Sequence, residues 1–121
     1  MTDIKVLCVE HHPAYMGALK YMLETAGYQV MPATTGEQAL NLIRAHRVLG
    51  VLLEHDLPDA SGAAVKAEMK RIKPTVPVLL FNGIDGQTPF LLRFLDSYLR
   101  NAEHPEGVFE DWEEDWENEL S

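Results

Sequence analysis

Short apolar runs alternate with segments of wider apolar spacing along about the first two thirds of the chain. Continuous apolar runs of this length are typical of strands buried on both faces, and apolar residues recurring every three or four positions are typical of helices with one buried face. The runs that we interpret as strands are Ile4 to Val9, Tyr28 to Ala33, Val48 to Leu53 and Val76 to Phe81.

The segments between these runs carry helix signals. Pro13 suits the first turn of a helix, and Gly27 suits the position after a helix end. Thr35-Gly36-Glu37 opens a second helix, and Ser61 or Gly62 opens a third that continues to Ile72. Apolar residues recur at helical spacing in all three segments. In the first two they are Ala14, Met16, Leu19, Met22 and Leu23, and then Ala39, Leu40, Leu42 and Ile43. In the third they are Ala64, Val65, Met69 and Ile72, which we expect to face inward. Strands alternating with helices predict an α/β fold with a parallel sheet.

The length of 121 residues and the hydrophobic content of 46% indicate one domain over residues 1–121. We see no apolar run long enough to span a membrane and no signal peptide, so we expect a cytoplasmic protein with no membrane partner. The single Cys8 excludes an internal disulfide and is expected to be a small core residue. No serine- or cysteine-based hydrolytic set and no P-loop is visible, so a stand-alone enzyme is not expected.

The net charge of −9 is unevenly distributed. Residues 1–102 hold ten acids and ten Lys or Arg, whereas residues 103–121 hold nine acids and no Lys or Arg. No basic patch stands out in the sequence, so direct nucleic-acid binding is not expected.

Polar side chains stand where three of the predicted strands end. Glu10 and His11 follow the first strand, Glu54 follows the third and Asn82 follows the fourth. Ligands of open α/β sheets bind at the carboxyl ends of the strands, near the switch in strand order. These four residues are therefore expected to converge on one site.

Two of these strand ends lie in motifs that resemble a known family. Val51 to Gly62 reads as a buried strand entering a tight Pro/Gly loop, and Val6 to Pro13 reads as a strand ending in polar residues. Together they resemble the receiver domain of two-component response regulators, over about residues 3–103. The resemblance implies a flavodoxin-like (βα)5 three-layer sandwich with a parallel sheet of order 2-1-3-4-5.

The resemblance places Glu54 at the position of the aspartate that takes a phosphoryl group from a histidine kinase. The two acids that hold Mg²⁺ in the family correspond to Glu10 and His11. Glutamate is one methylene longer than aspartate, which displaces the carboxylate from its reacting position. Mg²⁺ prefers oxygen ligands, whereas His11 supplies a nitrogen. Ordinary Mg²⁺-dependent phosphorylation is therefore not expected, although Mg²⁺ is the cofactor that the resemblance implies.

The resemblance also assigns three switch positions. Asn82 replaces the hydroxyl residue that follows the phosphoryl group, and Asn101 replaces the lysine that pairs with it. Tyr98 matches the aromatic residue that changes orientation on activation. One hypothesis is that Glu54 mimics the phosphorylated state, with its carboxylate accepting hydrogen bonds from the amides of Asn82 or Asn101. The other is an unswitched scaffold.

Two further alternatives stay open. One is a phosphorylatable receiver with unusual ligand geometry. The other is a metal- or pH-responsive module, in which Glu10, His11 and Glu54 bind a transition metal or the carboxylates raise the pKa of the histidine.

The segment after Asn82 has two interpretations. Thr88-Pro89 suits a helix start, and the apolar spacing beyond it fits one helix to Asn101. The resemblance instead implies a shortened fourth helix to about Leu95 and a fifth strand over Ser97–Arg100, which we favour because it completes the sheet. Residues 103–121 are expected to form a turn and an acidic last helix, packed on the sheet or docked on a partner.

The sequence thus predicts an atypical stand-alone receiver in phosphorelay or two-component signal transduction, acting by protein–protein contact. The expected partners are a histidine kinase or another signalling protein. A homodimer through the fourth-helix to fifth-helix face is also possible under the resemblance.

Overall fold

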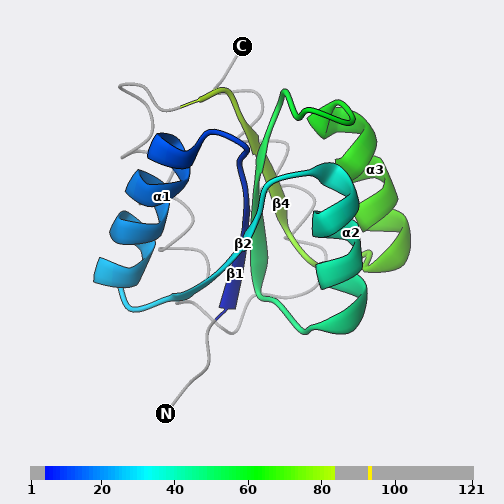
Figure 1. Ribbon diagram of the computed structural model, residues 1–121. Helices are drawn as coiled ribbons and strands as arrows, with labels where there is room; N and C mark the ends of the chain where they lie inside the picture. Colours follow the sequence, from blue (N-terminus) through cyan, green and yellow to red (C-terminus); the bar gives the residue numbers. More distant parts are fainter. Residues whose placement is uncertain (1–4, 84–92, 94–121) are drawn as a thin grey trace.

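The computed structural model describes residues 5–83 and Arg93. Its sheet contains β1 (Lys5–Val9), β2 (Gln29–Ala33), β3 (Gly50–Glu54) and β4 (Val78–Phe81), all parallel and in the order β2-β1-β3-β4 (Figure 1). This order confirms the predicted flavodoxin-like arrangement for the described strands. The expected fourth helix, fifth strand and acidic last helix lie outside the described residues.

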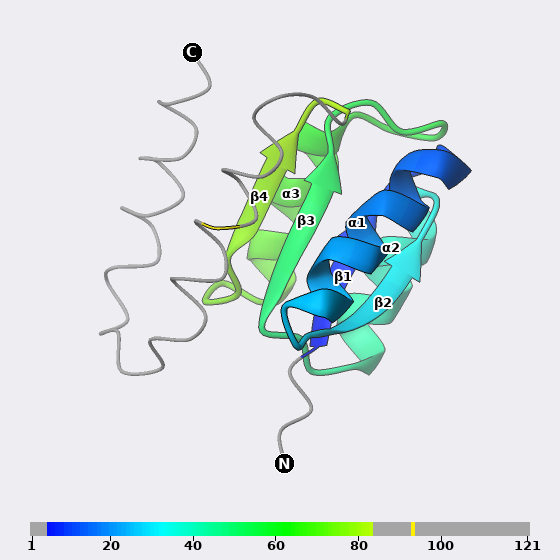
Figure 2. The ribbon, with the colours of Figure 1, turned by 90° about the vertical axis from the view of Figure 1, so that its left-hand side faces the viewer.

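Three helices cover the two faces of this sheet. α1 (Pro13–Thr25) lies on one face, and α2 (Gly36–Ala45) and α3 (Gly62–Ile72) lie on the other (Figure 2). Each connects two parallel strands, as a βαβ crossover requires. No helix in the part of the chain that the structure describes is long and apolar enough to cross a membrane.

The helix starts follow from their capping residues. The Thr35 and Ser61 hydroxyls accept hydrogen bonds from the backbone N–H groups of Gln38 and Ala64, each at 3.1 Å. Such caps satisfy N–H groups that the first helical turn leaves without partners. α1 instead begins with Pro13, which has no backbone N–H and so needs no acceptor there.

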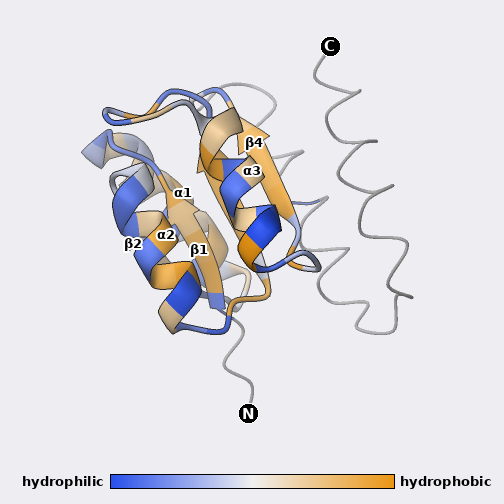
Figure 3. Cartoon of the chain, turned by 90° about the vertical axis from the view of Figure 1, so that its right-hand side faces the viewer, coloured by the Kyte–Doolittle hydropathy of each residue, from blue (hydrophilic) through white to orange (hydrophobic). Residues whose placement is uncertain are grey.

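The core lies mainly between the sheet and its helices. Strands β1 and β3 are central and almost fully buried, so hydrophobic residues occupy them nearly without alternation (Figure 3). Cys8 is 0% exposed and is a core residue, as predicted. One expectation was wrong: Ala64 is exposed rather than inward, because it lies in the first turn of α3 beside the Ser61 cap, while Val65 fills the core.

Candidate functional site

Two glutamates lie together at the carboxyl edge of the sheet. Glu54 is the last residue of β3, and Glu10 follows β1 directly. These strands are neighbours, with Val9 opposite Leu53, so the two glutamates occupy equivalent steps along adjacent strands. Glu10 is 1% exposed and Glu54 is 6% exposed, and they are the only buried charged residues in the described part. Of the four residues expected to converge, the structure thus places these two side by side.

The Glu54 carboxylate joins β3 to the segment that follows β4. Its Oε2 accepts a hydrogen bond from the backbone N–H of Gly83 at 2.9 Å, and its Oε1 accepts a longer one from the N–H of Asp56 at 3.4 Å. Hydrogen bonds to an ionised acceptor are stronger than neutral ones. The carboxylate thus holds two loops at the carboxyl edge against each other.

Glu10 has fewer partners than Glu54. Its Oε2 accepts the backbone N–H of His12 at 3.0 Å, whereas its Oε1 has no hydrogen-bond donor within the described residues. Burial raises the pKa of Glu10, the His12 N–H lowers it, and the neighbouring carboxyl group of Glu54 raises it further. A protonated Glu10 can donate to Glu54, whereas two ionised carboxylates repel each other. The geometry places two carboxyl groups side by side, and the protonated form is favoured at Glu10.

His11 does not complete this pair as a third buried ligand. Its side chain is 47% exposed, and its Nδ1 lies 3.6 Å from Oε2 of Glu10. The neighbouring His12 stacks on Tyr15, with ring centroids 4.3 Å apart, and so points along α1. Among the residues that the structure describes, no group of three or more His, Cys, Asp or Glu could hold a metal ion.

Of the three switch positions, Asn82 alone lies within the described residues. Asn82 is exposed, and the donors to Glu54 are the backbone N–H groups of Asp56 and Gly83 rather than the Asn82 amide. A backbone donor is fixed by the chain path, so it needs no ordered side chain. Tyr98 and Asn101 lie outside the described residues.

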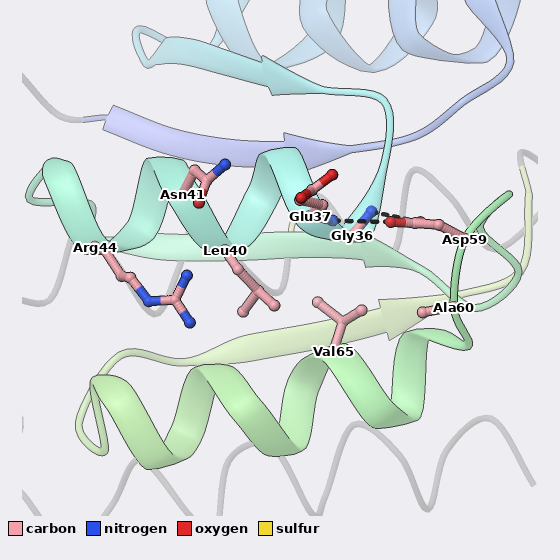
Figure 4. A pocket seen from close by; sticks show the side chains of 8 residues that line it. All are labelled: Gly36, Glu37, Leu40, Asn41, Arg44, Asp59, Ala60 and Val65. Atoms are coloured by element: carbon pink, nitrogen blue, oxygen red, sulfur yellow. Dashed lines mark hydrogen bonds between the residues drawn. The ribbon is translucent and has the colours of Figure 1, made fainter.

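A second carboxylate joins the loop after β3 to the start of α2. Asp59, in the loop after β3, accepts the N–H of Gly36 at 2.8 Å and that of Glu37 at 3.0 Å (Figure 4). These two N–H groups begin α2, and they lower the pKa of Asp59. Beside this contact a groove between α2 and α3 has a volume of about 370 Å³ and is lined by Leu40 and Val65.

Gly62 allows the loop after β3 to close tightly. A Cβ at this position would lie 2.5 Å from the carbonyl oxygen of Glu54 and 2.9 Å from Cα of His55. The Gly62 N–H donates to the carbonyl of His55, which returns the chain toward the end of β3. Only a residue without a side chain fits this approach.

The sequence did not single out the roles of Asp59 and Gly83. Asp59 bonds to Gly36 and Gly83 bonds to Glu54, and more than twenty residues separate the members of each pair. A local sequence pattern therefore cannot predict either contact. The available signal for Asp59 was its place in the Pro/Gly loop of the family motif.

Comparison with known proteins decides the family. A model of the response regulator receiver domain matches residues 6–98 of this chain. The chain belongs to this family.

A curated relative of this receiver domain is the alkaline phosphatase synthesis transcriptional regulatory protein PhoP of Bacillus subtilis. It is 30% identical over 107 residues, which are 86% of this chain and 45% of that protein. The receiver chain therefore spans about half the length of the curated relatives that it matches.

Solved receivers agree with the fold. The response regulator TrrA of Thermotoga maritima, in complex with Mg²⁺ and BeF, has a TM-score of 0.64 and 25% identity, covering 79% of this chain and 80% of that one. The same regulator in complex with the histidine kinase ThkA has a TM-score of 0.63 and 28% identity, covering 65% and 68%. Our chain is thus a receiver domain of two-component signalling.

Proposed function

We propose that this receiver transmits its signal by protein–protein contact, without phosphorylation of the residue at the phosphoacceptor position. The observation that carries the proposal is the pair of backbone hydrogen bonds to Glu54, from Gly83 at 2.9 Å and from Asp56 at 3.4 Å. A carboxylate in this position already supplies the negative charge and the acceptor oxygens that a phosphoryl group would bring.

The consequence is a fixed arrangement of the carboxyl edge. Phosphorylation switches a protein when the added charge orders a segment that is otherwise free. Here the side chain of Glu54 ties the segment after β4 to β3 through Gly83. The receiver would therefore present one conformation to its partners, independent of a phosphoryl donor.

The residues present do not fit the Mg²⁺ that the family implies. Both oxygens of Glu54 accept backbone hydrogen bonds, and Glu10 lies against Glu54 with a raised pKa. His11 offers an exposed imidazole nitrogen in place of a carboxylate oxygen. Mg²⁺ demands near-octahedral oxygen ligands, which these three side chains do not offer.

The partners would be a histidine kinase or another signalling protein of the cytoplasm. The TrrA receiver, 28% identical to this chain, has been solved in complex with the histidine kinase ThkA. Contact with such a kinase can persist without phosphoryl transfer, because docking and chemistry use different atoms. The homodimer through the fourth-helix to fifth-helix face remains part of this proposal, and that face lies outside the described residues.

The test is incubation of the full chain with a small phosphodonor and Mg²⁺, and, separately, thermal unfolding with Mg²⁺ and beryllofluoride. We expect no covalent phosphate by intact mass and no rise in the unfolding midpoint, because a ligand raises the midpoint only when it binds the folded state. The matched control is Glu54→Gln, which removes the charge at similar size. Phosphate incorporation that is lost in Glu54→Gln would show that the receiver is phosphorylatable and would overturn the proposal.

A further inference from the structure

A second hollow lies at the opposite edge of the sheet, where β3 and β4 begin. It has a volume of about 390 Å³, which is within the range of small-molecule sites in proteins. The loop that joins α2 to β3 and the loop that joins α3 to β4 line it, at the end of the sheet where β1 begins (Figure 1). We call this site the basic hollow, because its lining includes His46, Arg47 and Lys73 and no acidic residue.

Hydrogen bonds hold both of these loops in place. In the first loop, the backbone N–H of Leu49 donates to the carbonyl of Lys5, at the start of β1, at 2.9 Å. In the second loop, the N–H of Val76 donates to the carbonyl of Lys73 at 3.2 Å, and the carbonyl of Val76 accepts from Nζ of Lys70 at 2.9 Å. The hollow is therefore formed before any occupant binds, which lowers the entropic cost of binding.

Part of the lining is apolar. Ile43 and Val48 are buried, Val76 is half-buried, and Leu49 is 41% exposed. The other large hydrophobic residues that are exposed in the described part are tyrosines, whose hydroxyl groups suit contact with water. Leu49 has no polar atom in its side chain. The hollow thus offers apolar area to an occupant, beside its basic side chains.

Positive charge exceeds negative charge around the hollow. Residues 41–50 and 69–77 together hold five Lys or Arg and no Asp or Glu. Glu68 lies within ion-pair distance of Arg44 and pairs with Arg71, so it offsets one of these charges. The carboxyl ends of α2 and α3 carry about half a negative charge each and offset about one more. About three positive charges therefore remain in these two segments.

Arg47 and Lys73 carry the part of this charge that lines the hollow. Arg47 is exposed and Lys73 is half-buried, and within residues 5–83 neither has an acidic side chain within ion-pair distance. A guanidinium group presents a planar fork of N–H donors that matches a phosphate, and an ammonium group adds a compact charge. Two cations together complement a dianion such as a phosphate monoester better than they complement a single carboxylate.

We propose that the basic hollow binds a small aromatic phosphate monoester, with the phosphate on Arg47 and Lys73 and the aromatic ring on the apolar surface at Leu49 and Val76. The ring removes apolar surface from water, and the phosphate fixes the orientation of the ligand. β3 has five residues and so rises about 16 Å, which separates this site from Glu54 at the far end of the strand. The ligand would therefore bind without contacting the two buried glutamates.

Titration of the isotopically labelled full chain with naphthyl phosphate, followed by NMR, tests the site. We expect saturable shifts of the amide signals of residues 46–49, 73, 75 and 76. Naphthol, which lacks the charge, inorganic phosphate, which lacks the ring, and naphthoate, which carries one negative charge, should each bind about tenfold more weakly or less. Equally tight binding of naphthoate would overturn the assignment to a phosphate. Shifts confined to residues 54–56 and 83 would place the ligand at the carboxyl edge and would also overturn the proposal.

Arg47→Gln and Lys73→Gln should each weaken the binding of naphthyl phosphate about fivefold or more. The matched control is Lys20→Gln, which removes one positive charge from the exposed surface of α1, on the other face of the sheet (Figure 2). The amide spectrum of each variant shows in the same experiment whether the chain is folded. Unchanged affinity in both variants of the hollow, or an equal loss in Lys20→Gln, would overturn the proposal.

Leu49→Ser tests the apolar part of the site. The side chain of Leu49 is already 41% exposed, and its backbone N–H keeps its bond to Lys5, so the variant should remain folded. It should weaken the binding of naphthyl phosphate about threefold or more and leave the weak binding of inorganic phosphate unchanged. An equal loss for both ligands, or a loss for neither, would show that the ring does not contact Leu49 and would contradict the proposed site.

Discussion

The carboxylate of Asp59 accepts the backbone N–H of Gly36 at 2.8 Å, although 23 positions separate the two residues. With the second bond from Glu37, it caps α2 from a loop that follows β3. The loop carrying the family motif and the first turn of α2 are therefore one unit.

Asp59→Asn should destabilise the protein, because an amide offers one acceptor oxygen to two N–H groups. The lowered pKa of Asp59 means that its contribution to stability is present above the ordinary aspartate pKa and is lost as the pH falls through the lower, folded-state value. Urea unfolding at pH 7 and at a pH below the ordinary aspartate value of 3.8 measures both effects. The variant should lose less stability than wild type on acidification, and an equal loss in both proteins would contradict this assignment.

Glu10→Gln should change the pH dependence of stability in the opposite sense. The pKa of Glu10 is raised in the folded state, so its favourable contribution is complete below the ordinary glutamate pKa of 4.5 and declines as the pH rises through the folded-state value. Gln resembles the protonated acid and cannot ionise. We expect the free energy of unfolding of the variant to decline less than that of wild type as the pH rises above 4.5.

The control for this measurement is Glu24→Gln, at an exposed glutamate of α1. It should follow the wild-type profile. Parallel profiles for wild type and Glu10→Gln would show that Glu10 holds no extra proton in the folded state.

Gly62→Ala and Gly17→Ala form a second matched pair. The new methyl group at position 62 would lie 2.5 Å from the carbonyl oxygen of Glu54, so the loop must move, and we expect a loss of about 2 kcal/mol or more in unfolding free energy. At position 17, within α1, nothing in the described part lies within 4 Å of the added Cβ. There alanine should stabilise the helix by about 1 kcal/mol. Chemical denaturation of both variants measures the contrast, and an unchanged midpoint for Gly62→Ala would argue against the close approach.

The thiol of Cys8 should be inert in the folded protein. Burial and the nearby charge of Glu10 raise its pKa to about 12, so almost none of the reactive thiolate is present at neutral pH. An aromatic disulfide reagent should label it only as fast as the protein opens, and faster when urea is added. Immediate labelling of the native chain would be inconsistent with this burial.

The sequence predicts the strands and helices well where one signal dominates. Thr35 and Ser61 mark helix starts because their hydroxyls act within three residues, and Val6 to Val9 mark a central strand because both of its faces are buried. The approach of Glu10 to Glu54 follows from strand order once the fold is recognised. The alternation of strands and helices already favours that order, since it is common in sheets of this kind, and the family resemblance implies the same order.

The donors to Glu54 could not be predicted in the same way. One hypothesis named the side-chain amides of Asn82 or Asn101 as donors, because side chains are visible in a sequence. The donor from Gly83 is instead a backbone N–H, a group that every residue except proline carries. Which backbone N–H faces the carboxylate depends on the path of the loop, and Gly83 has a φ of 62° that glycine adopts readily. The exposure of the His11 side chain could not be predicted either, because it depends on the path of the chain just after β1.

Strand β2 ends the described sheet on one side, and its Pro32 lies opposite Cys8 of β1. The carbonyl oxygen of Ala33 accepts a hydrogen bond from the backbone N–H of Glu10. Because the backbone groups of successive residues in a strand point to opposite neighbours, those of Pro32 face away from β1. Pro32 has no backbone N–H, so at this position the strand edge lacks the donor that would pair with another strand. A foreign strand could not form a continuous ladder along this edge, which gives the receiver a built-in resistance to edge-to-edge aggregation on the side away from β4.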